Sequence, residues 1–463
     1  MLKIFPYLSF RRGQDLIYNI VSRFLDSSEN ELWVEAPTGV GKTAAVLSPL
    51  LEHGLRVLWV TRTLKEQEVV LKEVNRINRV HGTGFKVTLL RGISERCPYT
   101  RPPFPHQTCL TCKSIKCPYR EQFLEAFHSN VVVATYSMLR DSRDKVASLP
   151  VDVTVFDEAH TLHLPPVKRI PREWILRAAM EAGARPDPNI LLKYAGVAER
   201  IVLEKGFSYL YEVVRVLSSG EWFLDGSDVV VVDWGFRDWV KRTFMRKIYL
   251  TATAPPNVGG LKVSVPFNSK FIIYTGVKLP LKLRLRFLDE VARLIRLLGL
   301  FYKSVIFLPS TTYRDILYSK FDWEPLNVTV VLEEFEEVEK GVLLAVSGGK
   351  YSEGIDITAE AVAVIGVPYA KPDEYLRRIY RRYRFKGKRK LFYEYPAVVR
   401  AVQAIGRVLR NPNERKLVVL ADKRFLKLRK LLPLWLKKQE ILVIEDYRKL
   451  EKEIILFNTR LNQ

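Results

Sequence analysis

The sequence predicts an α/β protein built from two doubly wound parallel sheets, and three observations lead to this. Short β-branched runs alternate with helical stretches in both halves of the chain, as β/α units do. A glycine-rich turn at 35–43 follows one such run and opens a helix. The chain has 463 residues, more than one hydrophobic core usually serves, so two large domains are expected.

The expected strands fall into two groups with a different segment inside the first. The first group is 31–36, 56–63, 86–90, 130–136, 151–156 and 247–254, and the second is 304–310, 328–333, 341–347, 361–368, 416–422 and 440–446. Between the strands at 151–156 and 247–254, Leu, Ala and Tyr recur at helical spacing with Gly stops, which predicts a largely helical insertion. The expected division is domain 1 (1–96, 118–164 and 234–265), a four-cysteine insertion (97–117), the helical insertion (165–233) and domain 2 (266–463), with one sheet in each numbered domain.

Charge and composition narrow the classes of partner. The formal net charge of +23 favours a polyanion, nucleic acid before membrane, although solubility alone or a hyperthermophile's surface charge would also produce it. The first residues lack the long apolar run of a signal peptide, and no stretch approaches a membrane span. We therefore expect a monomeric cytoplasmic protein with no membrane partner.

The glycine-rich turn has the context of a phosphate-binding loop. Gly39 and Gly41 allow backbone N–H groups to converge on phosphates at a helix N-terminus, with Thr38 in the same loop. Lys42 would reach the β- and γ-phosphates, and the Thr43 hydroxyl would bind magnesium. A chance glycine-rich turn is the alternative, and its position between strand and helix argues against it.

An acidic pair follows another predicted strand. Asp157 could hold the magnesium ion, while Glu158 could orient and deprotonate an attacking water. His160 would connect this site to neighbouring motifs. Such a pair alone is usually a solvated turn, but together with the phosphate loop it indicates a nucleoside triphosphate hydrolase.

The second half supplies residues suited to a site between two domains. Arg407 and Arg410, in a segment that begins with Gln403, would lie on one face of a helix and touch the γ-phosphate from the opposite domain. As surface arginines of a helix they would otherwise be unremarkable.

All the cysteines lie in one short stretch, which argues against a dispersed disulfide scaffold. The set is Cys97, Cys109, Cys112 and Cys117. Four thiolates at this spacing could bind a [4Fe-4S] cluster, and on chemistry alone they fit a structural zinc ion equally well.

A basic run at 377–390 interleaves arginines and lysines with Tyr380, Tyr383 and Phe385. Cations that follow a backbone and rings that stack on bases are typical of single-strand binding. Arg381 and Arg382 are therefore candidate nucleic-acid contacts, with a solvated helix face as the alternative.

Together these motifs resemble the XPD/DinG-type iron-sulfur helicases of superfamily 2, in a compact archaeal-like form. Further matches, in order, are Arg11–Gln14, Thr61–Thr63, Tyr136, Thr251–Thr253, Phe307–Ser310, 347–356 and Asp422–Arg424. By this resemblance Gln14 reads adenine, Arg62 and Thr63 contact DNA, and Gly354 and Asp356 belong to the family's fifth, nucleotide-associated motif.

The resemblance implies an ATP-dependent helicase that moves 5′-to-3′ on single-stranded DNA and separates forked DNA at an iron-sulfur domain. Its cofactors would be ATP, magnesium and a [4Fe-4S] cluster, since that family carries its cluster at the position of these cysteines. Repair or transcription factors are the partner class. A translocase or clamp with little unwinding activity and an RNA-directed helicase with a zinc site remain as alternatives.

Overall fold

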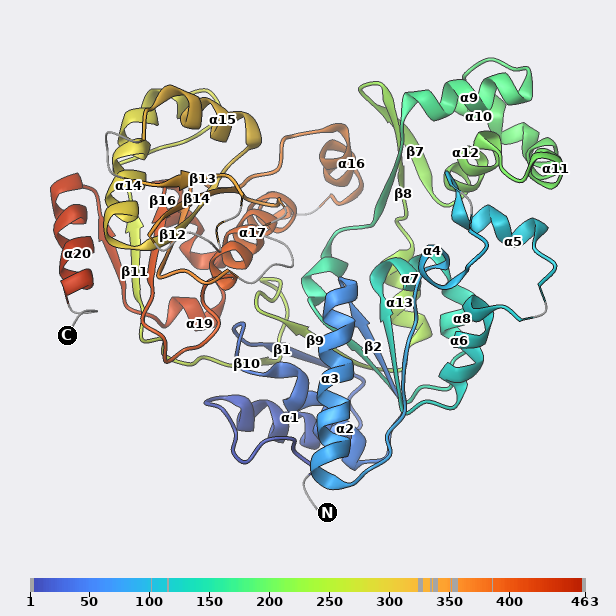
Figure 1. Ribbon diagram of the computed structural model, residues 1–463, viewed down its shortest axis with the longest axis horizontal. Coiled ribbons are helices and arrows are strands. Elements are labelled where there is room, and N and C mark those ends of the chain that lie inside the picture. The colour runs from blue at the N-terminus through green and yellow to red at the C-terminus, as the bar shows by residue number, and fades with distance from the viewer. Residues whose placement is uncertain are drawn as a thin grey trace.

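A computed structural model describes residues 4–100, 102–114, 116–323, 328–333, 335, 340–349, 351, 357–384 and 386–459. Two seven-stranded parallel sheets lie side by side, and an insertion projects from the first (Figure 1). The prediction of two doubly wound sheets is confirmed. Within the described residues, no helix combines the length and apolar character needed to cross a membrane.

The first sheet carries strands from both ends of its domain. Its order is β10 (Leu261–Lys262), β1 (Glu31–Glu35), β9 (Arg246–Thr251), β5 (Val153–Phe156), β2 (Val57–Thr61), β4 (Val131–Thr135) and β3 (Val87–Leu89). One face packs on α1 (Gln14–Asp26), α2 (Lys42–Glu52) and α3 (Leu64–His81). The other packs on α6 (Pro118–Phe127), α7 (Tyr136–Asp141), α8 (Arg143–Ala147) and α13 (Phe236–Thr243).

The second sheet contains a strand that the sequence analysis did not predict, β11, which comes first along the chain. Its order is β13 (Val330–Val331), β14 (Gly341–Val346), β12 (Lys303–Leu308), β15 (Ala361–Ile365), β16 (Leu417–Ala421), β11 (Lys270–Tyr274) and β17 (Ile441–Ile444). Its outer face packs on α14 (Leu288–Phe301), α15 (Thr311–Lys320) and α20 (Tyr447–Thr459). Its inner face packs on α17 (Tyr395–Gly406), α18 (Arg424–Leu428) and α19 (Leu434–Lys437).

Alternation along the strands explains why both faces are covered. In β2, Val57 and Trp59 enter the core with α1–α3, while Leu58 and Val60 enter the opposite core. A strand with both faces buried reads as a continuous apolar run, because water reaches neither side. Since all strands of each sheet are parallel, their carboxyl ends meet at one edge, where ligands of such sheets bind.

The insertion is less helical than predicted. It contains α9 (Arg172–Ala182), α10 (Pro188–Leu191), α11 (Ala195–Lys205) and α12 (Tyr209–Leu217). It also contains an antiparallel sheet of β6 (Val167–Ile170), β8 (Asp228–Val232) and β7 (Glu221–Asp225). Gly226 has φ 64° between β7 and β8, and a two-residue Gly-Ser loop is a hairpin signal. The segment before this loop has helical periodicity, and the prediction of a largely helical insertion followed that pattern.

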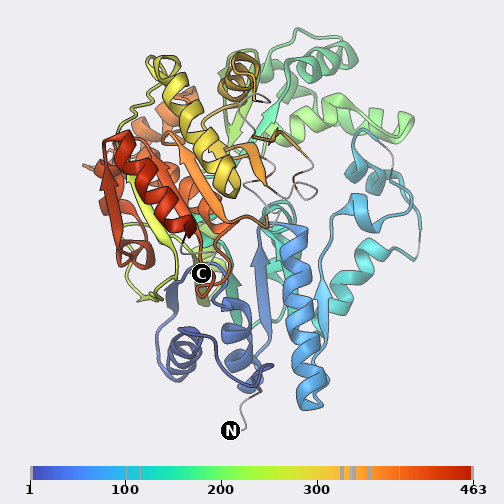
Figure 2. The ribbon, with the colours of Figure 1, turned by 60° about the vertical axis from the view of Figure 1, so that its left-hand side comes forward.

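The cysteine segment packs against the insertion. It consists of α4 (Ile93–Arg96), a 3₁₀ turn (Pro105–Gln107) and α5 (Thr108–Thr111). The buried Gln107 donates to the Ser208 carbonyl at 2.9 Å and accepts the Ser208 N–H at 2.7 Å. The Phe104 ring lies edge-on to Trp174, with centroids 5.0 Å apart. Figure 2 shows this segment beneath the helices of the insertion.

A helix of the second domain, α16 (Glu374–Arg382), contacts the same insertion from the other side. The Arg378 guanidinium pairs with Glu221 at 3.0 Å and lies 4.5 Å from the centroid of the Phe223 ring. The Tyr375 hydroxyl donates to the Pro165 carbonyl at 2.8 Å. The insertion is therefore held between the cysteine segment and domain 2.

Candidate nucleotide and nucleic-acid sites

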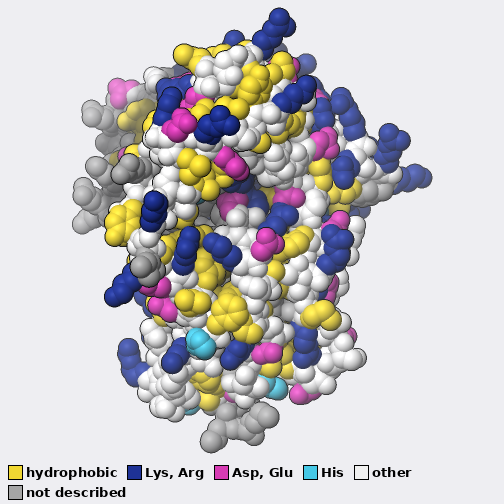
Figure 3. Space-filling model, turned by 90° about the vertical axis from the view of Figure 1, so that its right-hand side faces the viewer, with side chains coloured by type: hydrophobic (Ala, Val, Ile, Leu, Met, Phe, Trp, Pro, Cys, Tyr) yellow, Lys and Arg dark blue, Asp and Glu magenta, His cyan; other side chains and the backbone are white. Residues whose placement is uncertain are grey.

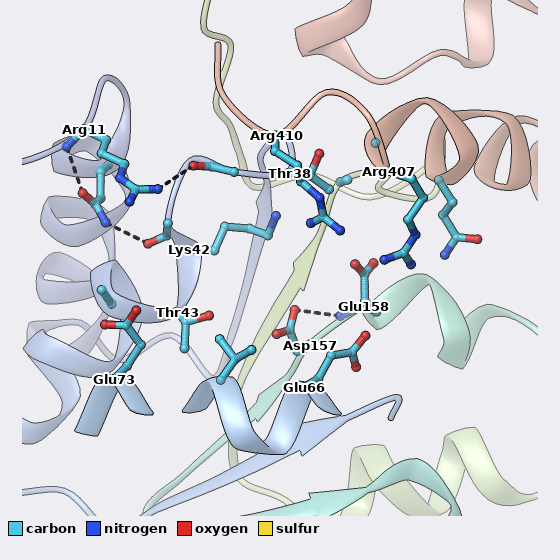
Figure 4. Close-up of a pocket in the computed structure, with 18 of the residues that line it drawn as sticks. Arg11, Thr38, Lys42, Thr43, Glu66, Glu73, Asp157, Glu158, Arg407 and Arg410 are labelled. Atoms are coloured by element: carbon cyan, nitrogen blue, oxygen red, sulfur yellow. Dashed lines mark hydrogen bonds between the residues drawn. The ribbon is translucent and has the colours of Figure 1, made fainter. Parts of the chain in front are cut away.

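A cavity of about 590 Å³ opens between the two domains, at the carboxyl edge of the first sheet. Domain 1 contributes the phosphate loop, the acidic pair and the N-terminal segment, and domain 2 contributes the end of α17. The predicted residues that line it are Gln14, Thr38, Gly39, Gly41, Lys42, Thr43, Asp157, Glu158, Gln403, Arg407 and Arg410. Figure 4 shows Arg407 and Arg410 directed toward Glu158, Asp157 and Lys42.

The phosphate loop is shaped for close approach by domain 2. Gly39 and Gly41 have φ of 81° and 85°, a region that favours glycine because a side chain would clash with the backbone. A Cβ on Gly39 would lie 1.5 Å from the carbonyl oxygen of Arg410. The Thr38 hydroxyl donates to the Leu409 carbonyl at 3.0 Å. Lys42 donates from Nζ to the carbonyls of Ala36 and Pro37 at 3.2 and 3.1 Å.

The acidic pair sits on a strained turn after β5. Glu158 has φ 49° and ψ 46°, and the structure must hold a non-glycine residue in this conformation at some cost in free energy. Its N–H donates to Asp157 Oδ1 at 2.9 Å, and the Tyr136 hydroxyl donates to the Asp157 carbonyl at 2.8 Å. The two carboxylates are thereby aimed into the cavity at different angles (Figure 4).

His160 joins the acidic pair to β9 of domain 1 and to α17 of domain 2. Its Nδ1 lies 3.2 Å from Glu158 Oε2 and 3.1 Å from the Thr251 hydroxyl, and its Nε2 lies 2.9 Å from Gln403 Nε2. Because the Gln403 amide nitrogen can only donate, Nε2 accepts, and the proton of a neutral ring sits on Nδ1. His160 thus directs a donor at Glu158 and Thr251.

The electrostatics of the pair separate its two members. Burial, together with the negative charge of Glu158, raises the pKa of Asp157. Burial also opposes ionisation of Glu158, but the hydrogen bond from His160 and the positive charges of Lys42 and Arg407 outweigh it and lower the pKa of Glu158. Desolvation lowers the pKa of Lys42 against the pull of Glu158 and Asp157. A cation beside Asp157 would favour its ionised form, which fits magnesium chemistry.

The two arginines do not share a helical face as predicted. Helix α17 ends at Gly406, with Arg407 as its C-cap, and Arg410 lies in the loop beyond. The backbone turns there because the N–H groups of Val408 and Leu409 both return to the Ile405 carbonyl. The turn brings the Arg410 carbonyl against Gly39, and both side chains still reach the cavity.

Sequence reasoning missed several residues that join the domains around Thr251–Thr253. The Tyr395 hydroxyl donates to the Thr253 carbonyl at 2.8 Å, and Trp435 Nε1 donates to the Ala252 carbonyl at 2.9 Å. The buried Glu35 accepts the N–H groups of Ala254 and Leu434 at 2.9 and 2.8 Å. Among these, only Glu35 lies beside an unusual position in the sequence, since Ala36 stands five residues before Gly41, where phosphate loops usually have glycine.

His163 was also missed. It is buried, and Nε2 donates to the Leu391 carbonyl at 2.8 Å within a π-helix, Lys390–Glu394, that leads into α17. Its ring stacks on Phe392 with centroids 5.4 Å apart. Burial lowers the pKa of His163 to about 4. Helical π-turns often mark functional positions, and this one connects the acidic pair's loop to the arginine helix.

The four cysteines lie around the start and end of the short helices described above. Cys97 and Cys117 are buried, and Cys109 and Cys112 are half-buried. Burial and the neighbouring Cys117 and Cys97 raise the pKa of Cys109. Among the described residues, no three ligand side chains converge on one metal position. Four thiols form a donor set that fits an iron-sulfur cluster, and the same set fits a structural zinc ion equally well.

Two of the predicted DNA contacts line a hollow of about 650 Å³ between domain 1 and its insertions. Arg62 and Thr63 face Pro105 and His106 of the cysteine segment and Arg215 of α12. Figure 3 views the molecule from the side of the insertions, and Lys and Arg side chains are interspersed there with hydrophobic and acidic ones. Thr63 also caps α3, because its hydroxyl accepts the Glu66 N–H and the Glu66 carboxylate accepts the Thr63 N–H.

Arg381 and Arg382 lie on α16, and both are engaged by acids. Arg382 pairs with Glu221 at 3.7 Å and lies 4.8 Å from the centroid of the Trp234 ring, while Arg381 pairs with Glu374 at 3.3 Å. The Arg382 side chain remains 52% exposed and the Arg381 side chain 70% exposed. Phe385 of the same run, and Gly354 and Asp356 with the rest of 352–356 and Lys350, lie outside the described residues.

Comparison with known proteins agrees with this geometry. A DEAD/DEAH box helicase family matches residues 12–178, and a helicase C-terminal domain family matches 287–439. The ATP-dependent DNA helicase XPD of Sulfolobus acidocaldarius is 36% identical over 95 residues, which are 19% of this chain and 17% of that protein. Two helicase families thus match this chain in succession, and the chain is similar to an XPD helicase.

Further members of the XPD family extend the comparison. The general transcription and DNA repair factor IIH helicase subunit XPD/RAD3 of Saccharomyces cerevisiae is 27% identical over 162 residues, 28% of this chain and 21% of that one. The alignments thus span about a fifth of both curated relatives. A solved XPD helicase structure shares the fold at TM-score 0.71 and 19% identity, covering 94% of this chain and 100% of its own.

The buried His163 gives a pH prediction. Because its pKa falls from the usual 6.5 to about 4, the unfolded state binds a proton that the folded state refuses. The stability that a neutral His163 contributes is fully present above pH 6.5. As pH falls from 6.5 to 4, the free energy of unfolding decreases by up to about 3 kcal/mol. His163→Gln keeps a donor for the Leu391 carbonyl but does not titrate. As pH falls from 6.5 to 4, its free energy of unfolding should therefore rise relative to that of the wild type.

Denaturant unfolding at a series of pH values measures the difference. His128→Gln, at an exposed histidine, is the matched control and should follow the wild type. Parallel curves for His163→Gln and the wild type between pH 6.5 and 4 would show that His163 is not held neutral.

Proposed function

We propose that this protein is an ATP-dependent DNA helicase whose ATP is hydrolysed between the two domains. One observation carries the proposal: Lys42, Asp157 and Glu158 of domain 1 line the same cavity as Arg407 and Arg410 of domain 2. Phosphoryl transfer needs little covalent help from the protein and depends on positioning and charge. A site completed from two domains lets hydrolysis change how the domains sit against each other.

The phosphates would lie on the loop around Gly39 and Gly41, at the N-terminus of α2. Lys42 Nζ donates to the carbonyls of Ala36 and Pro37, and it would donate to phosphate oxygens in their place once a nucleotide binds. Thr43 and Asp157 are the residues that would hold magnesium, which neutralises phosphate charge when bound. The pull of Lys42 on both carboxylates keeps the three groups electrically coupled.

Glu158 would orient the attacking water and accept its proton. Its lowered pKa keeps the carboxylate ionised, and His160 fixes its position through a contact of 3.2 Å. Arg407 and Arg410 would stabilise the charge that develops on the transferring phosphoryl group. Gln403, bonded to His160, would link the presence of the arginine segment to the orientation of Glu158.

Single-stranded DNA would pass through the hollow lined by Arg62, Thr63 and Arg215, with 5′-to-3′ as the proposed direction. DNA is favoured over RNA because the Sulfolobus relative is named as a DNA helicase and the yeast relative as a helicase subunit of a DNA repair factor. The yeast relative is a subunit of a transcription and DNA repair factor, so repair or transcription intermediates are the proposed substrates. Unwinding of duplexes with 5′ or 3′ tails, of DNA and of RNA, tests polarity and substrate together.

The cysteine segment would separate strands beside this hollow. Cys97, Cys109, Cys112 and Cys117 would hold a [4Fe-4S] cluster, which supplies four metal–thiolate bonds that keep a short segment rigid. Phe104 and Gln107 attach the segment to the insertion independently of the cysteines.

The first test of the function is Lys42→Ala. Loss of one positioned charge on the phosphates should lower DNA-stimulated ATP hydrolysis by at least about 10²-fold. Binding of single-stranded DNA should change little, because Lys42 does not line the hollow at Arg62. Phosphate release and fluorescence anisotropy measure the two properties. Lys72→Ala, an exposed lysine of α3, is the control, and unchanged turnover in Lys42→Ala would exclude this ATP site.

The arginines of α16 give a second test. If Arg381 and Arg382 contact phosphates, replacing both with glutamine should flatten the salt dependence of single-strand affinity by about 1.4 log units per log unit of salt. Glu221→Gln should strengthen binding several-fold at low salt, because Glu221 competes for Arg378 and Arg382. Glu199→Gln, an exposed acid of α11 far from α16 in Figure 1, controls for net charge. A slope indifferent to the double variant would make α16 a solvated face.

The third test separates the cluster from the ATPase. Cys112→Ser removes one thiolate, so iron and visible absorbance should fall and strand separation should be lost. DNA-stimulated ATPase should largely remain, because the cysteines do not line the ATP cavity. Thr111→Ser, at the adjacent exposed residue, is the matched control. Full unwinding by Cys112→Ser, or stoichiometric zinc without iron in anaerobically purified protein, would contradict the cluster assignment.

A further inference from the structure

Gln14, the residue that the family resemblance assigns to adenine, has its side chain engaged by the protein itself. It is 1% exposed. Its Oε1 accepts the N–H of Arg11 at 2.9 Å, and its Nε2 donates to the Gly41 carbonyl at 2.9 Å. Both ends of the amide are thus bonded, and almost no surface is left for a base to approach.

The fit around this amide is tight on the side of the phosphate loop. A Cβ on Gly41 would lie 2.5 Å from Gln14 Nε2. The preceding Gly13 has φ 80°, and a Cβ there would lie 2.9 Å from Val263 and Val265. Gln14 is therefore wedged behind the loop and fixes the direction of the Gly41 carbonyl. Arg11 adds a second tie, from its guanidinium to the Gly39 carbonyl at 3.2 Å.

An aromatic side chain lies at the end of the cavity that is farthest from the catalytic groups. In Figure 4, Arg11 and Glu73 lie at one end and Arg407 with Glu158 at the other, so a base would extend toward Arg11 and Glu73. Tyr7 lines this end, and its hydroxyl donates to Glu73 Oε1 at 2.7 Å. The guanidinium of Arg76 lies 4.7 Å from the Tyr7 ring centroid. The ring is thereby fixed in place.

Magnitudes decide what such a pocket can select. A site that reads a ligand through buried hydrogen bonds rejects one lacking them by about 10⁴-fold, whereas an apolar contact separates ligands by about 10–200-fold. Stacking tolerates every base because each has a π-face. We propose that the base is held by Tyr7 and Arg11 without being read, and that Gln14 positions the phosphate loop. The protein would then use all four nucleoside triphosphates with little discrimination.

This inference rests on the proposed ATPase, and one binding and one kinetic experiment test it. Displacement of a fluorescent ADP analogue by ADP, GDP, CDP and UDP should give dissociation constants within about tenfold of one another. DNA-stimulated kcat/KM for the four triphosphates should lie within the same range. Tyr7→Ala should weaken all four diphosphates about tenfold, and Tyr7→Phe should restore them.

Gln14→Ala is expected to lower kcat for the four triphosphates by a common factor of about ten while their ratios stay unchanged. Asp15→Asn, at the adjacent exposed residue, should match the wild type. A preference for ADP or ATP above about 100-fold that Gln14→Ala removes would overturn the inference and leave the ATPase standing. Equal binding of four diphosphates without hydrolysis of any triphosphate would keep the inference and overturn the proposed function.

Discussion

A chain of hydrogen bonds runs from Glu158 through His160 to Gln403 and crosses from one domain to the other. Because Gln403 can only donate to His160, the imidazole must present its Nδ1 proton to the acidic pair. The strained backbone at Glu158 is held by this chain and by the Asp157 contact. If domain 2 moved away, the tautomer, the tilt of the ring and the aim of the carboxylate would all lose their constraint.

The loop after β9 is the second point where the domains meet. Its residues 251–254 are each held by a different neighbour: His160, Trp435, Tyr395 and Glu35. The hydrophobic core is also continuous here, since buried residues of α17 and α19 belong to the same cluster as buried residues of α1 and α2. A rearrangement at the phosphates thus meets a packed, hydrogen-bonded interface, which shifts between discrete arrangements more readily than it deforms.

The insertion extends this connection away from the ATP cavity. It touches domain 2 through Arg378 and Tyr375 of α16, and it touches the cysteine segment through Trp174 and Ser208. Exposed ion pairs such as Arg382 with Glu221 contribute little energy, whereas the buried Gln107 pair and the aromatic contacts are harder to break. The arrangement offers a physical route between the ATP cavity and the cysteines, made of contacts that differ in strength.

The sequence by itself determined the two parallel sheets, because buried strands must be apolar on both faces and parallel strands need helical crossovers. It also determined the phosphate loop and the acidic pair as candidates, since short motifs fix their own backbone geometry. Only the tertiary structure decided that α17 ends before Arg407, that Gln14 is bonded within the protein, and that His163 and Glu35 join the domains. The contacts of Gln14, His163 and Glu35 reach residues 27, 228 and 399 positions away in the chain, and no local pattern encodes them.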